Sequence, residues 1–320
     1  MQDLGYLALA IVHARAYIQE CCPLGTFLEE YRTSKVSFLK TRHTQTGDDY
    51  EHTVFTTWKM SFNKLRPLAA TFLSVVAFMH HDGVREAIFS NAASRITAEN
   101  PSTVAMEFLT QLRKEGKWDS FQFRDSVVRE LISFSLITHD RKNDIFSIHP
   151  LVHFWIQSEV GNRNLFCQAA QTILALATDW RFKAEDYAFR RILLPHVQQA
   201  VNHEILVDHS SMSVFGLIFR ESGLYTEAEK LQVVAMETMK RALGDEHPDT
   251  LTSMANLAEM FRNQGRWNEA EKLEVVVMET RKRVLGDRHR DTLTSMARLA
   301  STFRSQGRWD EAEKLQVVAP

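Results

Sequence analysis

The C-terminal third of the chain repeats itself at an offset of about 42 residues. The octapeptide that starts at Gly265 returns at Gly307, and a weaker copy starts at Gly223. A second block, Leu243 to Leu251, returns at the same offset. Self-similarity at a fixed spacing is the signature of repeat proteins, in which each unit packs only on its neighbours. The sequence therefore predicts a stacked array in residues 205–320.

Each unit is predicted to contain two helices. The first begins near Pro248, which suits the first turn of a helix, and Asp249 places a negative charge at the same end. Apolar residues then recur at spacings of three and four, as on one face of a helix. Gly265 supplies the turn, and the second helix ends in a glycine cap at Gly286. This pattern favours an α-α superhelix and a mainly α fold class.

Small and aromatic residues recur at matched positions of the first helices: Gly216, Ala258, Ala300, Phe219, Phe261 and Phe303. Together with the following glycine, tyrosine or tryptophan, and alanine, this series resembles the tetratricopeptide repeat, whose small residues let two helices approach closely. The linker from Leu243 to Leu251 is similar to that of the kinesin-light-chain type. The resemblance implies about three units of ~42 residues in 205–320, and a partner that is a protein or peptide.

Polar residues at two matched positions of the first helices are the candidate ligand residues: Arg220, Arg262, Arg304, Asn256 and Arg298. Arginine presents a two-pronged donor that suits carboxylates, so these residues predict binding of an acidic peptide. The alternative is that the arginines are solvated or paired with neighbouring glutamates such as Glu259. The last helix, from Trp309 to Ala319, leaves an apolar flank that a capping helix normally covers, which predicts self-association.

Residues 66–160 are predicted to form helices followed by one β-hairpin. The last helix before the hairpin spans 123–134, and the strands span 135–138 and 145–148. This order is typical of a winged helix, which can bind DNA. However, the predicted helix over 123–134, which would contact the DNA bases, has mixed charge. The net charge of −2 also gives no basic excess for binding nucleic acid or an anionic membrane. A winged-helix transcriptional regulator is therefore the less favoured alternative, and no nucleic-acid partner is expected.

Four short segments carry a second resemblance: 4–10, 56–62, 67–78 and 146–152. They resemble the regulatory half of the NB-ARC module, which belongs to the STAND class of signalling NTPases, in the fungal forms that carry tetratricopeptide repeats. The resemblance implies a partial ARC-like helical segment in 1–65, a winged-helix-like domain in 66–160 and a helical bridge in 161–204. It also implies that His149 would contact the phosphates of bound ADP.

The motifs of an enzyme are not found. A phosphate-binding loop ends in Gly-Lys-Ser or Gly-Lys-Thr, but Gly116 and Lys117 are followed by Trp118. We therefore expect no catalytic residues and no cofactor, with ADP or ATP bound only if a phosphate-loop portion is supplied. His149 and His153 lie four residues apart, but Pro150 stands where a zinc hydrolase needs glutamate. No metal site is expected.

The sequence thus predicts a non-catalytic protein–protein interaction module, as a fragment or degenerate relative of a fungal STAND or NLR-type signalling receptor. Two alternatives remain open: a stand-alone adaptor of the kinesin-light-chain type, and an accessory protein of a biosynthetic gene cluster. Three cysteines without a disulfide framework, together with no export signal and no long apolar run, predict a cytoplasmic location and no membrane partner.

Overall fold

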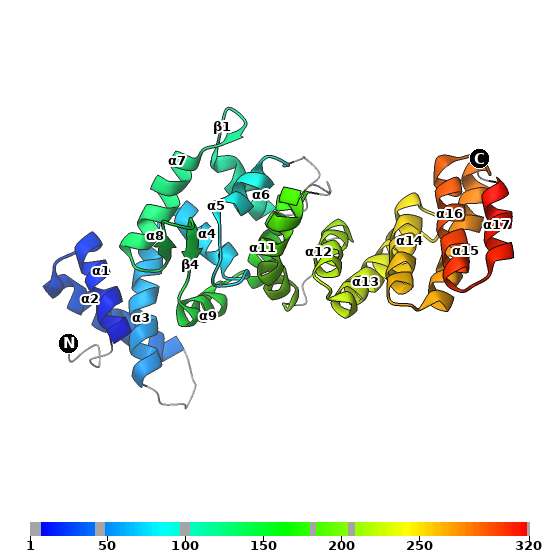
Figure 1. Cartoon of the computed structure of the whole chain (residues 1–320). Coiled ribbons are helices and arrows are strands. Elements are labelled where there is room, and N and C mark those ends of the chain that lie inside the picture. The colour runs from blue at the N-terminus through cyan, green and yellow to red at the C-terminus, as the bar shows by residue number, and fades with distance from the viewer. Residues whose placement is uncertain (1–7, 42–48, 97–102, 180–183, 204–208, 319–320) are drawn as a thin grey trace. The chain divides into compact units, whose positions relative to one another are not determined.

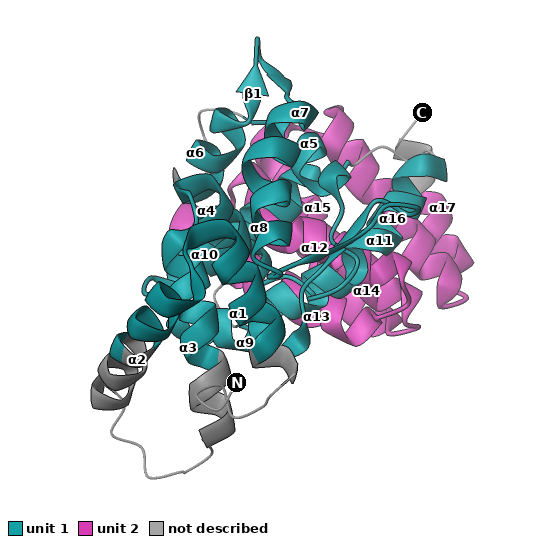
Figure 2. Ribbon diagram, turned by 90° about the vertical axis from the view of Figure 1, so that its left-hand side faces the viewer, with its two compact units in different colours: residues 1–205 teal, residues 206–320 magenta. Residues whose placement is uncertain are grey.

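The computed structural model describes all residues except 1–7, 42–48, 97–102, 180–183, 204–208 and 319–320. The chain divides into two compact units, Met1–Ile205 and Leu206–Pro320, which Figure 2 shows in different colours. Helices dominate both units, and the described residues contain only two short strand pairs. The mainly α fold class is therefore confirmed.

The N-terminal unit begins with three helices that pack on one another: α1 (Ala8–Cys21), α2 (Leu24–Thr41) and α3 (Asp49–Lys64). Short helices and strands follow: α4 (Pro67–Val76), α5 (Glu86–Ala93), α6 (Thr103–Gln111), β1 (Arg113–Lys114), β2 (Lys117–Trp118), α7 (Ser120–Phe123), α8 (Arg129–Ser133), β3 (Thr138–Asp140) and β4 (Ile145–Ser147). Three more helices end the unit: α9 (Pro150–Glu159), α10 (Arg163–Ala177) and α11 (Ala184–Val201). Figure 1 shows their order.

The predicted hairpin is present as β3 and β4, which pair antiparallel with His139 opposite Phe146. Its first strand begins later than predicted, at Thr138. Ser135 has a positive φ of 57°, a conformation that ends the preceding helix rather than extending into a strand. Phe146 also forms an isolated bridge with Val84, which ties the hairpin to the segment before α5.

The prediction of a single hairpin is incomplete, because β1 and β2 form a second antiparallel pair. Glu115 and Gly116 join these strands with φ angles of 52° and 77°. Two consecutive positive φ angles match the twist of a two-residue hairpin turn. The predicted continuous helix over 123–134 is likewise interrupted, by a π-helical turn at Arg124–Val128 between α7 and α8.

An aromatic cluster forms the core around α4, α5 and α7. The ring centroids of Phe72 and Phe89 lie 5.1 Å apart, and Phe123 lies 5.5 Å from Phe72. All three side chains are fully buried. α10 packs against α4, α5 and α6, so a helix distant in the sequence covers this core.

The described residues of the C-terminal unit form three pairs of helices, and each pair contains a first and a second helix. Their bounds are α12 (His209–Glu221), α13 (Tyr225–Leu243), α14 (Pro248–Asn263), α15 (Trp267–Leu285), α16 (Arg290–Ser305) and α17 (Trp309–Val318). His247 caps the start of α14, where its Nδ1 accepts a hydrogen bond from the backbone N–H of Asp249 at 3.2 Å. Gly244 and Gly286 each adopt a φ of 90° after a second helix, which explains why glycine recurs there.

The core of this unit is repeated like its sequence. Leu257, Ala258, Phe261 and Ala270 form one buried cluster between α14 and α15. A second cluster lies between α16 and α17 at equivalent positions of the next repeat: Leu299, Ala300, Phe303 and Ala312. The alanines let paired helices approach closely, so the two-helix repeat predicted from the sequence is confirmed.

Candidate functional site

Arginine and glutamate side chains link the first helices of all three repeats. Nη1 of Arg220, on α12, lies 3.4 Å from Oε1 of Glu259, on α14. Nη1 of Arg298, on α16, lies 3.5 Å from Oε2 of the same carboxylate. Each of these side chains is about one-third exposed. We call the surface formed by Arg220, Glu259, Arg262 and Arg298 the first-helix face.

Arg262, on α14, joins the same face at its inner edge. Its Nη1 donates to the backbone oxygen of Arg298 at 3.5 Å and lies 4.0 Å from Oε1 of Glu274, on α15. The side chain of Glu274 is only 2% exposed, and burial raises the pKa of its carboxyl group. Thr302 and the two arginines Arg262 and Arg298 oppose this shift. Arg262 is therefore a cation held beside a buried acid.

The two remaining predicted residues make fewer contacts. Arg304, on α16, is exposed, and within the described part of the chain its side chain forms no ion pair. Asn256, on α14, is half-buried. The structure thus brings three of the predicted arginines together and leaves Arg304 in solvent, at the position equivalent to Arg220 and Arg262. Their role in ligand binding stays a prediction.

A second set of ion pairs lies where two of the second helices, α15 and α17, begin. Arg266 binds Glu229 of the preceding repeat at 2.6 Å and Glu269 of its own helix at 2.6 Å. Its guanidinium also lies over the ring of Phe261, 4.2 Å from the centroid. The arginine lowers the pKa of Glu269. Arg308 repeats this arrangement, so these arginines join adjacent repeats.

Sequence reasoning missed this second set, because it assigned no role to the glutamates of the second helices. The available signal was the recurrence of arginine directly after the turn glycine, at Arg266 and Arg308. The first repeat has Leu224 there instead. An arginine is present at this position in only two of the three repeats, and its recurrence alone did not indicate which neighbouring residues it contacts.

His149 is exposed at the start of α9. Its Nδ1 accepts a hydrogen bond from the backbone N–H of Leu151 at 3.2 Å, so the imidazole caps this helix. The nearby His153 is buried, and its Nε2 contacts the backbone oxygen of Met79 at 2.8 Å. Within the described part of the chain, no group of three or more His, Cys, Asp or Glu residues could hold a metal ion. The nucleotide-sensing role of His149 stays a prediction.

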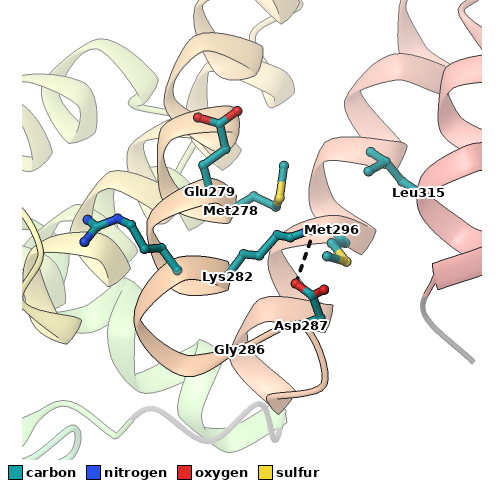
Figure 3. Close-up of a pocket in the computed structure, with 8 residues that line it drawn as sticks. Met278, Glu279, Lys282, Gly286, Asp287, Met296 and Leu315 are labelled. Carbon is teal, nitrogen blue, oxygen red and sulfur yellow. Dashed lines mark ion pairs between the residues drawn. The ribbon is translucent and has the colours of Figure 1, made fainter.

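A cavity of about 740 Å³ lies in the C-terminal unit and is lined in part by Met278, Met296 and Leu315 (Figure 3). These side chains come from α15, α16 and α17. Lys282 and Asp287 form an ion pair of 3.3 Å at its edge. Its lining includes none of the predicted ligand residues. Self-association of the chain stays a prediction.

Two sequence families match parts of the chain. Residues 210–249, 250–291 and 292–319 match the family described as Tetratricopeptide repeat. Residues 60–165 match a family described as Domain of unknown function (DUF7779). Residues 210–319 are therefore tetratricopeptide repeats, a class of protein-interaction repeats that typically serve as non-catalytic scaffolds. None of the described helices is long and apolar enough to cross a membrane.

One curated relative is described as a nucleotide-binding leucine-rich repeat (NLR)-like protein of Hyaloscypha variabilis. It is 29% identical over 274 residues, which make up 79% of this chain and 25% of that protein. The predicted resemblance to NLR-like proteins with tetratricopeptide repeats is thus confirmed. The chain spans about a quarter of the length of this relative.

Two solved structures also match about half of the chain. One contains the nearly identical TPR-like repeats of a Podosopora anserina protein described as a kinesin light chain, with 22% identity and a TM-score of 0.41. It covers 52% of this chain and 80% of that one. The other is BtubC (BKLC) from P. vanneervenii, with 17% identity, a TM-score of 0.38, and coverage of 51% and 65%.

Proposed function

We propose that the first-helix face binds a protein segment that carries carboxylates. The observation that carries this proposal is the convergence of Arg220, Arg262 and Arg298, one from each first helix, on a single surface. Their three guanidinium groups outnumber the two carboxylates beside them, those of Glu259 and Glu274. A surplus of cations on a repeat surface suits an acidic peptide.

The test reverses the charge of the three arginines of the first-helix face, one in each repeat: Arg220→Glu, Arg262→Glu and Arg298→Glu in the full chain. A fluorescein-labelled hexaglutamate peptide with an amidated C-terminus is titrated at low salt and followed by anisotropy. We expect the triple variant to bind at least tenfold more weakly than the unmodified chain. Equal affinity of the two proteins would refute the proposal.

The matched control changes three exposed arginines elsewhere in the same unit: Arg241→Glu, Arg283→Glu and Arg288→Glu. It alters the net charge by the same amount but leaves the first-helix face unchanged. We expect it to keep most of the affinity, because screening at a distance weakens long-range attraction. Affinity capture with the same three proteins, followed by mass spectrometry, then identifies natural partners.

The chain is further proposed to act as part of an NLR-type signalling protein in the cytoplasm, with no catalytic activity of its own. The similarity to the Hyaloscypha variabilis protein over 79% of the chain supports this proposal. In such a protein residues 66–160 would form the winged-helix-like regulatory part, and His149 would sense a nucleotide held by a phosphate loop supplied elsewhere. ATP hydrolysis by the purified chain that disappears in a His149→Ala variant would contradict the non-catalytic proposal.

A further inference from the structure

Glu259 is peculiar to the middle repeat. The equivalent positions of the other two repeats hold Leu217 and Ser301. All three residues lie on first helices, and each of these helices forms although the side chain at this position differs between the repeats. The packing of the repeat therefore does not require a carboxylate there, and Glu259 is available for another role.

The contacts of Glu259 are long for ion pairs. Its two oxygens lie 3.4 and 3.5 Å from the nearest nitrogens of Arg220 and Arg298. Charge-assisted hydrogen bonds between nitrogen and oxygen are typically about 2.7–2.9 Å. In the same unit, Arg266 binds Glu229 at 2.6 Å. The carboxylate of Glu259 is thus shared loosely between two cations, and another carboxylate can replace it.

Two arginines of the first-helix face, Arg262 and Arg298, make contacts that do not depend on Glu259. Nη1 of Arg298 also donates to the backbone oxygen of Ala255, at 3.3 Å. Nη1 of Arg262 donates to the backbone oxygen of Arg298, at 3.5 Å. These bonds to the main chain keep two guanidinium groups on the first-helix face when the carboxylate leaves. Arg298, one of the two arginines beside Glu259, is therefore already held in place before a ligand binds, which lowers the entropic cost of binding.

We infer that Glu259 occupies, in the free protein, the position that a glutamate or aspartate side chain of the partner takes between Arg220 and Arg298. Each oxygen of Glu259 faces one of these arginines, which is how a bridging carboxylate of a ligand would bind. The partner must displace Glu259, so this residue weakens binding and selects for segments with several carboxylates. The inference rests on the proposed function of the first-helix face.

The test compares the unmodified full chain with Glu259→Gln and Glu259→Ser variants, using the same labelled hexaglutamate. Glutamine keeps the shape of the side chain, and serine is the residue of the next repeat, so both suit the fold. We expect both variants to bind about fivefold more tightly than the unmodified chain, because no internal carboxylate competes. The control is Glu279→Gln, which removes an exposed charge from α15 without touching the first-helix face.

The salt dependence supplies a second readout. In the unmodified chain, a ligand carboxylate replaces that of Glu259, so the number of ion pairs made by the arginines changes little on binding. The affinity should therefore decrease only slightly as the salt concentration rises. We expect a steeper loss of affinity with salt in Glu259→Gln, where binding creates new ion pairs.

The outcomes separate the two proposals. If hexaglutamate binds, and the Arg220, Arg262 and Arg298 reversals abolish binding, but Glu259→Gln binds no more tightly than the unmodified chain, the inference is wrong and the proposed function stands. If Glu279→Gln tightens binding as much as Glu259→Gln, the effect is one of net charge, and the inference is again wrong. If neither the unmodified chain nor Glu259→Gln binds the peptide, both proposals fail.

Discussion

Thr302 donates a hydrogen bond to the buried carboxylate of Glu274, with 2.5 Å between Thr302 Oγ1 and Glu274 Oε2. This bond joins α16 to α15 across the contact between two repeats. Among the described residues, the other oxygen, Oε1, has no hydrogen-bond partner. The preceding repeat has the neutral Gln232 at this position, which donates to both the hydroxyl and the backbone oxygen of Ser253. The array therefore accepts either a charged or a neutral side chain at one repeat position.

A Glu274→Gln variant is expected to stabilise the contact between α15 and α16 by about 1 kcal/mol at neutral pH. The substitution removes a charge that is buried with one oxygen unsatisfied. The measurement is hydrogen exchange of peptides from both helices in the full chain, with Glu279→Gln as an exposed control. Faster exchange in Glu274→Gln would show that the charge of Glu274 is stabilising.

Glu274 should also make the local stability of the contact between α15 and α16 depend on pH. Burial raises the pKa of Glu274 in the folded chain, so the folded state holds this proton more tightly than the unfolded state does. Local stability should therefore fall as pH rises from the ordinary pKa of glutamate through the raised value, and stay lower above it. Glu274→Gln should lack this component. An unchanged pH profile in hydrogen exchange, after correction for intrinsic rates, would contradict the assignment.

Arg281→Met is expected to leave the stability of the repeats within about 1 kcal/mol of the unmodified chain, or to raise it. Arg281 is buried without an ion pair within the described part of the chain, and burial lowers the pKa of its guanidinium. The equivalent residue of the preceding repeat is the buried Met239. Replacing a buried charge by an apolar side chain of similar volume is often neutral or stabilising.

The partners of Arg281 explain why its removal should be tolerated. Its guanidinium donates to Ser295 Oγ at 3.0 Å and to Thr252 Oγ1 at 3.2 Å. Both hydroxyls also donate to backbone oxygens of their own helices, so neither is left without a partner. Urea unfolding of Arg281→Met and of an exposed control, Arg283→Met, measures the difference. A loss of more than about 2 kcal/mol would show that the hydrogen bonds outweigh the cost of burial.

Glu86→Ala is expected to destabilise the N-terminal unit by about 2–3 kcal/mol. The carboxylate of Glu86 is nearly buried and accepts hydrogen bonds from Trp118 Nε1 at 2.9 Å, from Arg124 Nε at 3.0 Å and from the hydroxyl of Ser120. Removal leaves three donors without this acceptor. The exposed Glu107 of α6 supplies the control, as Glu107→Ala.

Thermal unfolding followed by tryptophan fluorescence suits this comparison, because Trp58 and Trp155 of this unit are fully buried. A lowered midpoint in Glu86→Ala but not in Glu107→Ala is expected. Equal midpoints for both variants would mean that the hydrogen bonds of Glu86 contribute little net stability.

Because of His196, we expect the N-terminal unit to lose folding stability in acid. Its Nε2 lies 3.2 Å from the backbone oxygen of Gly83, and burial lowers the pKa of the imidazole from 6.5 to about 4. The nearby His80 adds to this lowering, while Asp82 and the bond to Gly83 oppose it. The unfolded state thus binds the proton more readily, and stability is lost as pH falls from about 6.5 to about 4.

The lost stability amounts to at most about 3 kcal/mol for His196 alone. A His196→Gln variant, which keeps a donor for Gly83, should lose less stability over the same pH range. The fluorescence midpoint at several pH values measures the effect. The control is His247→Asn, which changes a half-exposed helix cap of the other unit. If His196→Gln and the unmodified chain respond equally to acid, other groups cause the sensitivity.

The repeat helices could be predicted because their information is local. Spacings of three and four, a turn glycine and a repeat of about 42 residues each depend on neighbours within one unit. The interrupted helix over 123–134 shows the limit of this reasoning, since no local pattern indicated the π-helical turn at Arg124–Val128. The pair of β1 and β2 was missed because a strand of two residues is too short to show the alternation of apolar and polar residues that predicts a strand.

The sequence by itself determined the two-helix repeat, the number of its copies and the presence of arginines on the first helix of each copy. Only the tertiary structure decided what those arginines contact. Arg220 and Glu259 are 39 residues apart, and so are Glu259 and Arg298, but a single carboxylate reaches both arginines because stacking brings three first helices together. Periodicity places a residue on a face of its own helix, whereas the packing of neighbouring helices selects its partner.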